Sequence, residues 1–278
     1  MSPRKTTSLG KFPGTLVLVG AGKMGSAMLE GWLARGLKTR QIVVVEPHPA
    51  KGVKALTKRG IRLNPKGKPA PASAIVVAVK PQTAPEALPH LSAYVGKGTL
   101  VLSIMAGRTM GFLEKSLPEH TAIVRAMPNT PAAIGRGISV AVANPNVSAR
   151  QRKQASDLLA AIGKVEWIKD EALMDAVTAL SGSGPAYVFL LAEAMASAGI
   201  AAGLPPALAT RLAQETVAGS GELLHRSTSG ASTLRENVTS PGGTTAAALD
   251  VLMGPGGFQE LLNRAILAAT HRSRELAG

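Results

Sequence analysis

The stretch Leu16-Val17-Leu18-Val19-Gly20-Ala21-Gly22-Lys23-Met24-Gly25 decides the predicted fold of this chain. Four apolar residues form a short strand, and the glycines follow with the spacing G-x-G-x-x-G, directly before an amphipathic segment at residues 24–35. In such a turn Gly20 permits the tight turn, Gly22 lets a pyrophosphate approach the backbone, and Gly25 lets helix and strand pack closely. The helix N-terminus supplies N–H donors for an anion. We therefore predict a dinucleotide-binding turn, and the strand, helix and second strand around it disfavour a plain glycine turn.

Apolar runs like the first one recur through the first 170 residues and alternate with amphipathic segments. The runs are continuous, which is typical of parallel strands that are buried on both faces. The strands are expected at residues 15–19, 42–46, 74–79, 100–104, 122–125, 138–143 and 165–168, and the helices between them at residues 24–35, 49–59, 85–94, 110–117 and 149–162. This alternation predicts an α/β protein with a Rossmann-type, doubly wound domain over residues 15–169.

The strand signal ends near residue 170, and Ala-rich helical segments follow. They are expected at residues 171–180, 185–202, 206–225, 244–252 and 258–274. Apolar and small residues lie on several faces of these helices, which is more than one small bundle needs to bury. We therefore predict that residues 170–278 form an all-helical dimerisation and substrate domain in a homodimer or larger homo-oligomer. Residues 1–14 are basic and are expected to form a flexible tail.

Composition excludes several classes of protein. The chain has 278 residues, of which 45% are hydrophobic, so it can bury a large core. It contains no cysteine, which excludes disulfides, thiolate zinc sites, iron–sulfur clusters and a cysteine nucleophile. We expect no metal site and a cytoplasmic location.

The formal net charge of +14 leaves the kind of partner open. Between Pro47 and Pro85 the chain carries lysines and arginines without one acidic residue, yet aromatic residues make up only 3% of the chain. Few aromatic residues means little stacking with bases, so a solvated or anion-facing surface is favoured over nucleic acid. Residues 185–204 approach membrane length, but Glu193 lies near their middle, which favours a buried packing helix. We expect neither a nucleic-acid nor a membrane partner.

Glu46 ends the second predicted strand, and this residue and the residues that follow it indicate different cofactors. An acid at this position usually accepts hydrogen bonds from the ribose hydroxyls of NAD, which favours NADH. His48, Lys51 and Lys54 follow immediately and could neutralise the additional phosphate of NADPH. Glu46 could also be an ordinary solvated strand end, so the choice of cofactor stays open.

Three further strand ends carry loops that should converge with the glycine turn. They are Val79-Lys80-Pro81-Gln82, residues 103–107 with Ala106, and residues 125–131 with Asn129. Ligands of open α/β sheets bind at these carboxyl ends, so Lys80 and Asn129 could contact the nicotinamide half of a cofactor. The alternative is that the prolines stop strands and the polar residues cap helices.

Two helix starts in the second half are unusually rich in small residues. Ser181-Gly182-Ser183-Gly184-Pro185 opens one helix, and Val238-Thr239-Ser240-Pro241-Gly242-Gly243-Thr244-Thr245 opens another. Glycines and hydroxyls at a helix N-terminus can form an anion-binding nest that fits a carboxylate. Ordinary Ser/Thr capping is the alternative.

Five motifs in order make the chain resemble the pyrroline-5-carboxylate reductase family from about residue 15 to the C-terminus. They are VGAGKMG at 19–25, AVKPQ at 78–82, RAMPNTPA at 125–132, SGSGPAYVF at 181–189 and VTSPGGTTAAAL at 238–249. The resemblance implies reduction of 1-pyrroline-5-carboxylate to L-proline, the last step of proline biosynthesis, with NADPH or NADH as hydride donor. It also implies a substrate site where the two domains meet.

The resemblance also implies the roles of individual residues. The cofactor residues would be Gly20, Ala21, Gly22, Lys23, Met24, Gly25, Glu46, Val79, Lys80, Pro81, Ala106 and Asn129. Ser240, Gly242, Gly243, Thr244 and Thr245 would bind the substrate, and Thr245 is the candidate catalytic donor. The chain departs from the family at Glu46, where many relatives carry Ser or Thr, and at Ala231-Ser232, where a proline–glycine pair is usual. We therefore expect residues 227–233 to be more mobile.

Two other functions stay open. One is a related imine reductase with another substrate; a hydroxyacid dehydrogenase is disfavoured because residues 174–225 hold no lysine. The other is a nicotinamide-binding regulatory protein without catalysis, which the hydroxyls of Ser240, Thr244 and Thr245 argue against.

Overall fold

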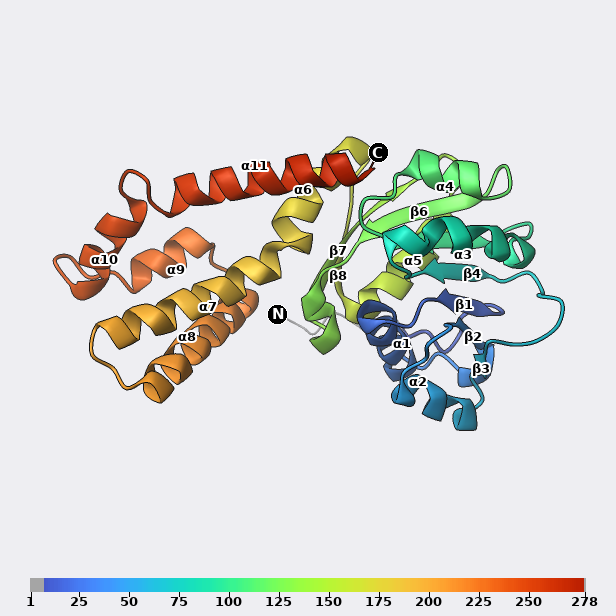
Figure 1. Cartoon of the computed structure of the whole chain (residues 1–278), viewed down its shortest axis with the longest axis horizontal. Helices are drawn as coiled ribbons and strands as arrows, with labels where there is room; N and C mark the ends of the chain where they lie inside the picture. The colour runs from blue at the N-terminus through green and yellow to red at the C-terminus, as the bar shows by residue number, and fades with distance from the viewer. Residues whose placement is uncertain (1–7, 278) are drawn as a thin grey trace. The chain divides into compact units, whose positions relative to one another are not determined.

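The computed structural model describes residues 8–277, which form two compact units. One unit contains the chain up to Gly182 together with the segment that begins at Thr270, and the other contains Ser183–Ala269. The first unit holds the sheet and the second is helical (Figure 1). The boundary at residue 170 that the sequence favours remains a prediction.

A single eight-stranded sheet forms the centre of the first unit. Its order is β3-β2-β1-β4-β5-β6-β7-β8, so the chain reverses its direction of progress across the sheet between β1 and β4. This order and the parallel pairing of the first six strands confirm the doubly wound, Rossmann-type prediction. The strands are β1 (Leu16–Val19), β2 (Ile42–Val45), β3 (Arg62–Leu63), β4 (Ala74–Val77), β5 (Leu100–Ser103), β6 (Ala122–Met127), β7 (Gly137–Ala143) and β8 (Gly163–Trp167).

Helices cover both faces of the sheet, which explains why the strands are apolar throughout. Leu16 and Leu18 of β1 belong to one core with Trp32, whereas Val17 and Val19 belong to the core on the opposite face with Leu88. The helices of this unit are α1 (Lys23–Ala34), α2 (Lys51–Ala55), α3 (Ala84–Leu91), α4 (Met110–Ser116), α5 (Ala149–Leu159) and α6 (Met174–Val177). Each lies within or beside a predicted helical segment.

Two features of the sheet differ from the expectation. Strand β7 runs antiparallel to β6, because only a short connection containing the 3-10 helix Thr130–Ile134 joins them, and a parallel crossover needs a longer one. Strand β3 was missed because it has two residues and begins with the exposed Arg62, so it shows no apolar run.

The segment before β1 is packed from Leu9 onward. Leu9 and Phe12 are buried, and the Leu9 amide donates to the carbonyl oxygen of Arg35. The Gln41 side chain donates to the carbonyl oxygens of Phe12 and Gly14. The expectation of a flexible tail is therefore wrong for residues 9–14, because two apolar side chains find cover there; residues 1–7 lie outside the described part.

The helical unit contains α7 (Gly184–Ala201), α8 (Pro206–Arg226), α9 (Ala231–Asn237), α10 (Thr244–Met253) and the first part of α11 (Phe258–Ala277). Helices α7 and α8 pack where Gly199 lies against the buried Ala209. Greater mobility at residues 227–233 stays a prediction, and the residues of this segment from Ala231 onward are helical. There α9 begins, with Gly230 in an extended conformation at its N-cap.

Helix α7 is exposed in the single chain, so residues 8–277 do not supply the burial expected for residues 185–204, and burial against a second subunit stays a prediction. Phe189 and Leu190 each expose 62% of their surface. The continuous helical stretch Glu171–Ala201 is long and apolar enough to cross a membrane by length and composition, and 0% of its most apolar window is buried. This helix therefore has an apolar surface that residues 8–277 leave uncovered.

Candidate functional site

The predicted cofactor residues meet at the carboxyl edge of the sheet. The glycine turn follows β1, Glu46 follows β2, Val79-Lys80-Pro81 follows β4, Ala106 follows β5 and Asn129 follows β6. These strands are parallel neighbours, so their carboxyl ends lie on one side, and the reversal between β1 and β4 lies in their midst. Open α/β sheets bind ligands at such a switch point.

The glycine turn has the geometry that a pyrophosphate needs. Gly20 has φ of +88°, and a Cβ atom on Gly25 would collide with the Gly20 carbonyl oxygen, so both positions need glycine. A Cβ atom on Gly22 would meet no atom within 4 Å. Gly22 is also the N-cap of α1, where no side chain caps the helix, so no cap occupies the N–H groups of Lys23 and Met24 at its first turn. The turn fits a dinucleotide phosphate.

Glu46 lies against the glycine turn. Its Oε2 atom accepts a hydrogen bond of 2.7 Å from the Ala21 amide, and its Oε1 atom accepts one of 2.9 Å from the His48 amide. Asn64 binds the backbone of Glu46 in both directions, with distances of 2.8 and 2.9 Å. Hydrogen bonds therefore fix both the side chain and the backbone of Glu46, and the alternative that it is an ordinary solvated strand end is wrong.

The Lys80-Pro81 turn is held by Arg108, which the sequence analysis missed. The Nε and Nη2 atoms of Arg108 donate to the Pro81 carbonyl oxygen at 3.0 and 2.8 Å, and its guanidinium lies 4.5 Å from the Phe112 ring centre. The side chain of Lys80 stays exposed beside this clamp. An arginine directly after the loop at residues 103–107 was the available signal.

Asn129 is only partly free for a ligand. Its Oδ1 atom accepts a hydrogen bond of 2.9 Å from the Ile138 amide, and its Nδ2 atom lies 3.5 Å from the Ser181 hydroxyl. The side chain therefore orders the connection from β6 to β7, and one amide N–H group and one lone pair of Oδ1 remain for a cofactor. Its contact with nicotinamide stays a prediction.

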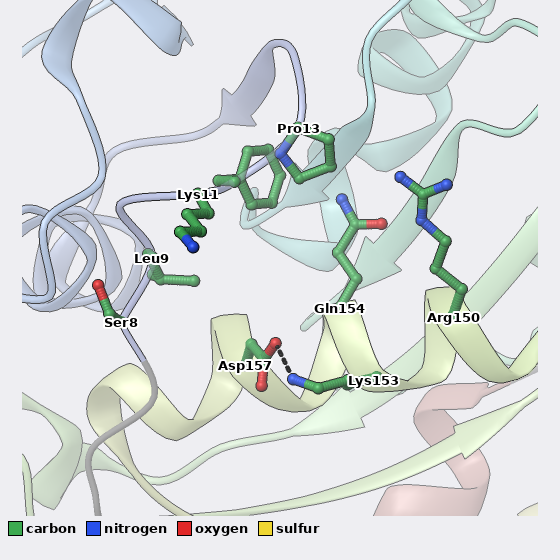
Figure 2. Close-up of a pocket in the computed structure, with 9 residues that line it drawn as sticks. Ser8, Leu9, Lys11, Pro13, Arg150, Lys153, Gln154 and Asp157 are labelled. Atoms are coloured by element: carbon green, nitrogen blue, oxygen red, sulfur yellow. Dashed lines mark hydrogen bonds and ion pairs between the residues drawn. The ribbon is translucent and has the colours of Figure 1, made fainter.

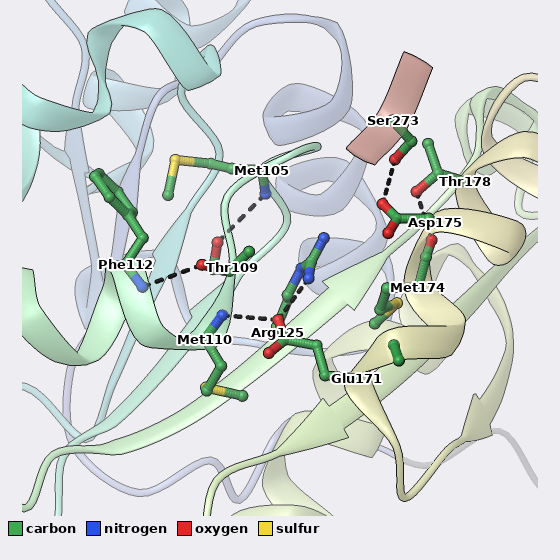
Figure 3. A network of polar contacts seen from close by, with 12 residues as sticks. Met105, Thr109, Met110, Phe112, Arg125, Glu171, Met174, Asp175, Thr178 and Ser273 are labelled. Atoms are coloured by element: carbon green, nitrogen blue, oxygen red, sulfur yellow. Dashed lines mark hydrogen bonds and ion pairs between the residues drawn. The ribbon is translucent and has the colours of Figure 1, made fainter. Parts of the chain in front are cut away.

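A buried arginine on β6 pairs with a partly exposed glutamate. Arg125 on β6 is 5% exposed, and its Nη1 atom lies 2.5 Å from Oε1 of Glu171, which also accepts from the Met110 amide at 2.7 Å (Figure 3). Ser273 donates to Asp175 at 2.6 Å in the same region. A buried arginine in a strand needs a partner for its charge, so the sequence indicates that an acidic partner exists but does not single out Glu171.

The predicted substrate residues form one turn in the helical unit. Gly242 has φ of +67°, the Gly243 amide donates to the Ser240 carbonyl oxygen at 3.0 Å, and a Cβ atom on Gly243 would collide with Ser240 Oγ. Gly243 is the N-cap of α10 and no side chain caps this helix, so Ser/Thr capping is wrong here. The N–H groups of Thr244 and Thr245 stand at its first turn, where a carboxylate fits.

A separate cavity of about 330 Å³ lies between residues 8–13 and α5 (Figure 2). It is near the amino end of β1, and none of the predicted site residues lines it. Among residues 8–277 there is no group of three or more His, Asp or Glu side chains that could hold a metal.

Comparisons with known proteins agree with this geometry. Residues 171–276 match the family model for pyrroline-5-carboxylate reductase dimerisation, and residues 15–107 match the model for coenzyme F420-dependent NADP oxidoreductases. The chain is 40% identical to a pyrroline-5-carboxylate reductase of Synechocystis, over 94% of this chain and 97% of the relative. It is 39% identical to one of Pseudomonas aeruginosa, over 94% and 96% of the two chains.

Solved structures give the same result. A pyrroline-5-carboxylate reductase of Coxiella burnetii matches with a TM-score of 0.88 and 33% identity, over 95% of this chain and 99% of that one. The Plasmodium falciparum pyrroline carboxylate reductase, solved with NADP bound, matches with a TM-score of 0.79 and 30% identity, over 96% and 99%.

The glycine turn at the switch point and the helical second unit define a nicotinamide-dinucleotide oxidoreductase with a dimerisation domain. Within this class the chain belongs to the pyrroline-5-carboxylate reductase family.

Proposed function

We propose that this protein reduces 1-pyrroline-5-carboxylate to L-proline, the last step of proline biosynthesis, using NADH or NADPH. The observation that carries the proposal is the end-to-end similarity to pyrroline-5-carboxylate reductases, at 40% identity over 94% of the chain. The glycine turn and the Ser240–Thr245 turn both keep the geometry that this reaction needs. A related imine reductase and a non-catalytic regulatory protein are the competing functions, and the test below separates them.

Each of the two turns has a distinct task in the proposed mechanism. A bound reduced nicotinamide would supply hydride to the carbon of the substrate C=N bond. The backbone N–H groups of Thr244 and Thr245 and the Ser240 hydroxyl would bind the substrate carboxylate and fix the face of its ring, while the Gly243 amide, bound to the Ser240 carbonyl oxygen, would hold the turn in shape. The Thr245 hydroxyl would lie beside the ring nitrogen, where it can donate a hydrogen bond to a neutral imine or accept one from the N–H of a protonated substrate. A threonine is a weak acid, so the proton itself would come from water or from substrate already protonated in solution.

We also propose that the protein works as a homodimer or larger homo-oligomer. The exposed apolar side chains of α7, such as Phe189 and Leu190, support this because a second copy would remove them from water. The same argument assigns the exposed apolar surface of α7 to an interface between subunits. A cytoplasmic location, with no membrane or nucleic-acid partner, completes the proposal.

The test compares Thr245→Val with Thr245→Ser while cofactor absorbance reports turnover of 1-pyrroline-5-carboxylate. Valine removes the hydroxyl and keeps the shape, so turnover should fall about 10- to 1000-fold, whereas serine should retain most of it. Cofactor affinity should not change in either variant. An unaltered rate in the valine variant would remove Thr245 from the mechanism. Wild-type protein that binds cofactor without turning over this substrate would favour another imine substrate or a regulatory role.

A further inference from the structure

We propose that Glu46 makes this protein select NADH over NADPH. The inference rests on the proposed function and concerns the adenosine end of the same cofactor site. It starts from the position of the carboxylate, which the structure holds between the glycine turn and the chain that follows β2.

The side chain of Glu46 has a fixed position. Residues Val19 and Val45 are paired partners at the ends of β1 and β2, and the Gly20 amide donates to the Val45 carbonyl oxygen at 2.9 Å. The first residue after β2 is therefore next to the glycine turn. There the Glu46 carboxylate bridges the amides of Ala21 and His48 at 2.7 and 2.9 Å.

The backbone of Glu46 is held as firmly as its side chain. Asn64 accepts a hydrogen bond from the Glu46 amide at 2.8 Å and donates one to its carbonyl oxygen at 2.9 Å. Asn64 adopts φ of +44°, in the left-handed region that asparagine tolerates better than most residues. Four hydrogen bonds thus fix this one residue before any ligand arrives, and such preorganisation favours the ligand that matches it.

The fixed carboxylate matches a ribose diol. A carboxylate has about four lone-pair positions, and the two backbone amides occupy only one on each oxygen. The remaining positions can accept hydrogen bonds from the 2′- and 3′-hydroxyls of the adenosine ribose of NADH. Each acceptor is already oriented, so the ribose gains hydrogen bonds without a rearrangement of the protein.

The same carboxylate opposes a phosphate on the 2′-hydroxyl. That phosphate would bring close to two further negative charges toward Glu46, and like charges at short distance repel. It would also need N–H donors, and the nearby amides of Ala21 and His48 are already bound to Glu46. Both the charge and the hydrogen bonds therefore disfavour NADPH.

The basic side chains that follow Glu46 act in the opposite direction but more weakly. His48, Lys51 and Lys54 are all exposed, whereas Glu46 is partly buried. Solvent and salt screen exposed charges more than partly buried ones. The attraction of these side chains for a phosphate is therefore weakened more than the repulsion between the phosphate and Glu46. We expect these cations to raise the affinity for both dinucleotides and not to reverse the preference.

The experiment measures the dissociation constants of NADH and NADPH by titration calorimetry, without substrate. A second pair of probes, 5′-AMP and 2′,5′-ADP, reports on the adenosine end alone. The wild-type protein should bind NADH at least about 10-fold more tightly than NADPH. Glu46→Ser should free the Ala21 and His48 amides and shift the ratio of the two constants at least about 30-fold toward NADPH.

Two further variants keep the result interpretable. Glu46→Gln keeps the shape and an oxygen acceptor but removes the charge, so its two dissociation constants should come within a few-fold of each other if the turn stays intact. Glu30→Ser removes the same charge from an exposed position on α1 and should leave the ratio unchanged. Equal or tighter NADPH binding by the wild type, or an unchanged ratio in Glu46→Ser, would overturn the inference. These readouts need no turnover, so they separate a failure of this inference from a failure of the proposed function.

Discussion

Replacing Gly22 with alanine tests the central element of the site, because the change affects the ligand and the protein to different degrees. A Cβ atom at this position would meet no protein atom within 4 Å, and φ of −68° suits alanine. The folded protein therefore has room for the methyl group. A pyrophosphate that rests on the Gly22 backbone would not.

The expected magnitudes follow from this difference. Glycine is preferred to alanine at a helix N-cap by at most about 1 kcal/mol, which would lower the melting temperature by about 2–4 °C in a protein of this size. A methyl group forced into a close contact costs about 1–3 kcal/mol, and this corresponds to about 5- to 150-fold weaker dinucleotide binding. The affinity should therefore change far more than the stability.

The assay combines calorimetric titration of NADH with thermal unfolding, and two neighbouring changes serve as references. Gly25→Ala forces a Cβ atom onto the Gly20 carbonyl oxygen, so it should lower both affinity and stability. Gly52→Ala lies on exposed α2 with no atom within 4 Å of its Cβ, and it should leave binding unchanged and stability equal or higher. Wild-type affinity in Gly22→Ala would show that no phosphate approaches this turn, and the cofactor site would have to be placed elsewhere.

Two further predictions concern stability and assembly. Glu171→Gln leaves the buried Arg125 without its charge partner, so urea unfolding should show a loss of stability of about 1–3 kcal/mol. Arg272→Gln, in an exposed ion pair, should stay within about 0.5 kcal/mol of the wild type. Equal losses of stability in the two variants would contradict the role of burial. Phe189→Glu places a charge on the exposed apolar surface of α7 and should dissociate the oligomer, which light scattering at micromolar concentration would show as a lower mass. The equally drastic Ile134→Glu in the sheet unit should leave the mass unchanged. An unchanged mass for Phe189→Glu would exclude this surface from the interface.

The features that depend on neighbours in sequence could be predicted from the sequence. The strand before Gly20, the helix after it and the position of Glu46 follow from local spacing and period. The direction of β7 could not, since it depends on the length of the connection from Asn129 onward. The predicted second strand also extends one residue too far, to Glu46, where side-chain hydrogen bonds replace the sheet pairing.

Side chains that bind distant backbone atoms left no pattern in the sequence. Arg108 clamps a carbonyl oxygen 27 residues earlier, and Asn64 holds Glu46 from 18 residues later. Such partners meet only after the sheet has formed, so no local window contains both. The turn at residues 240–245 could be predicted more easily, because Ser240 and Gly243 interact within one turn and the glycines themselves indicate it.

The sheet unit is discontinuous along the chain, because its last segment begins at Thr270 after the whole helical unit. Ser273, in that last segment, binds Asp175, so this contact joins residues 98 positions apart. During synthesis the first 182 residues therefore leave the ribosome without this last segment, which follows only after the whole helical unit. A gene fragment that stops at residue 182 would likewise produce the sheet without the helix end that binds Asp175.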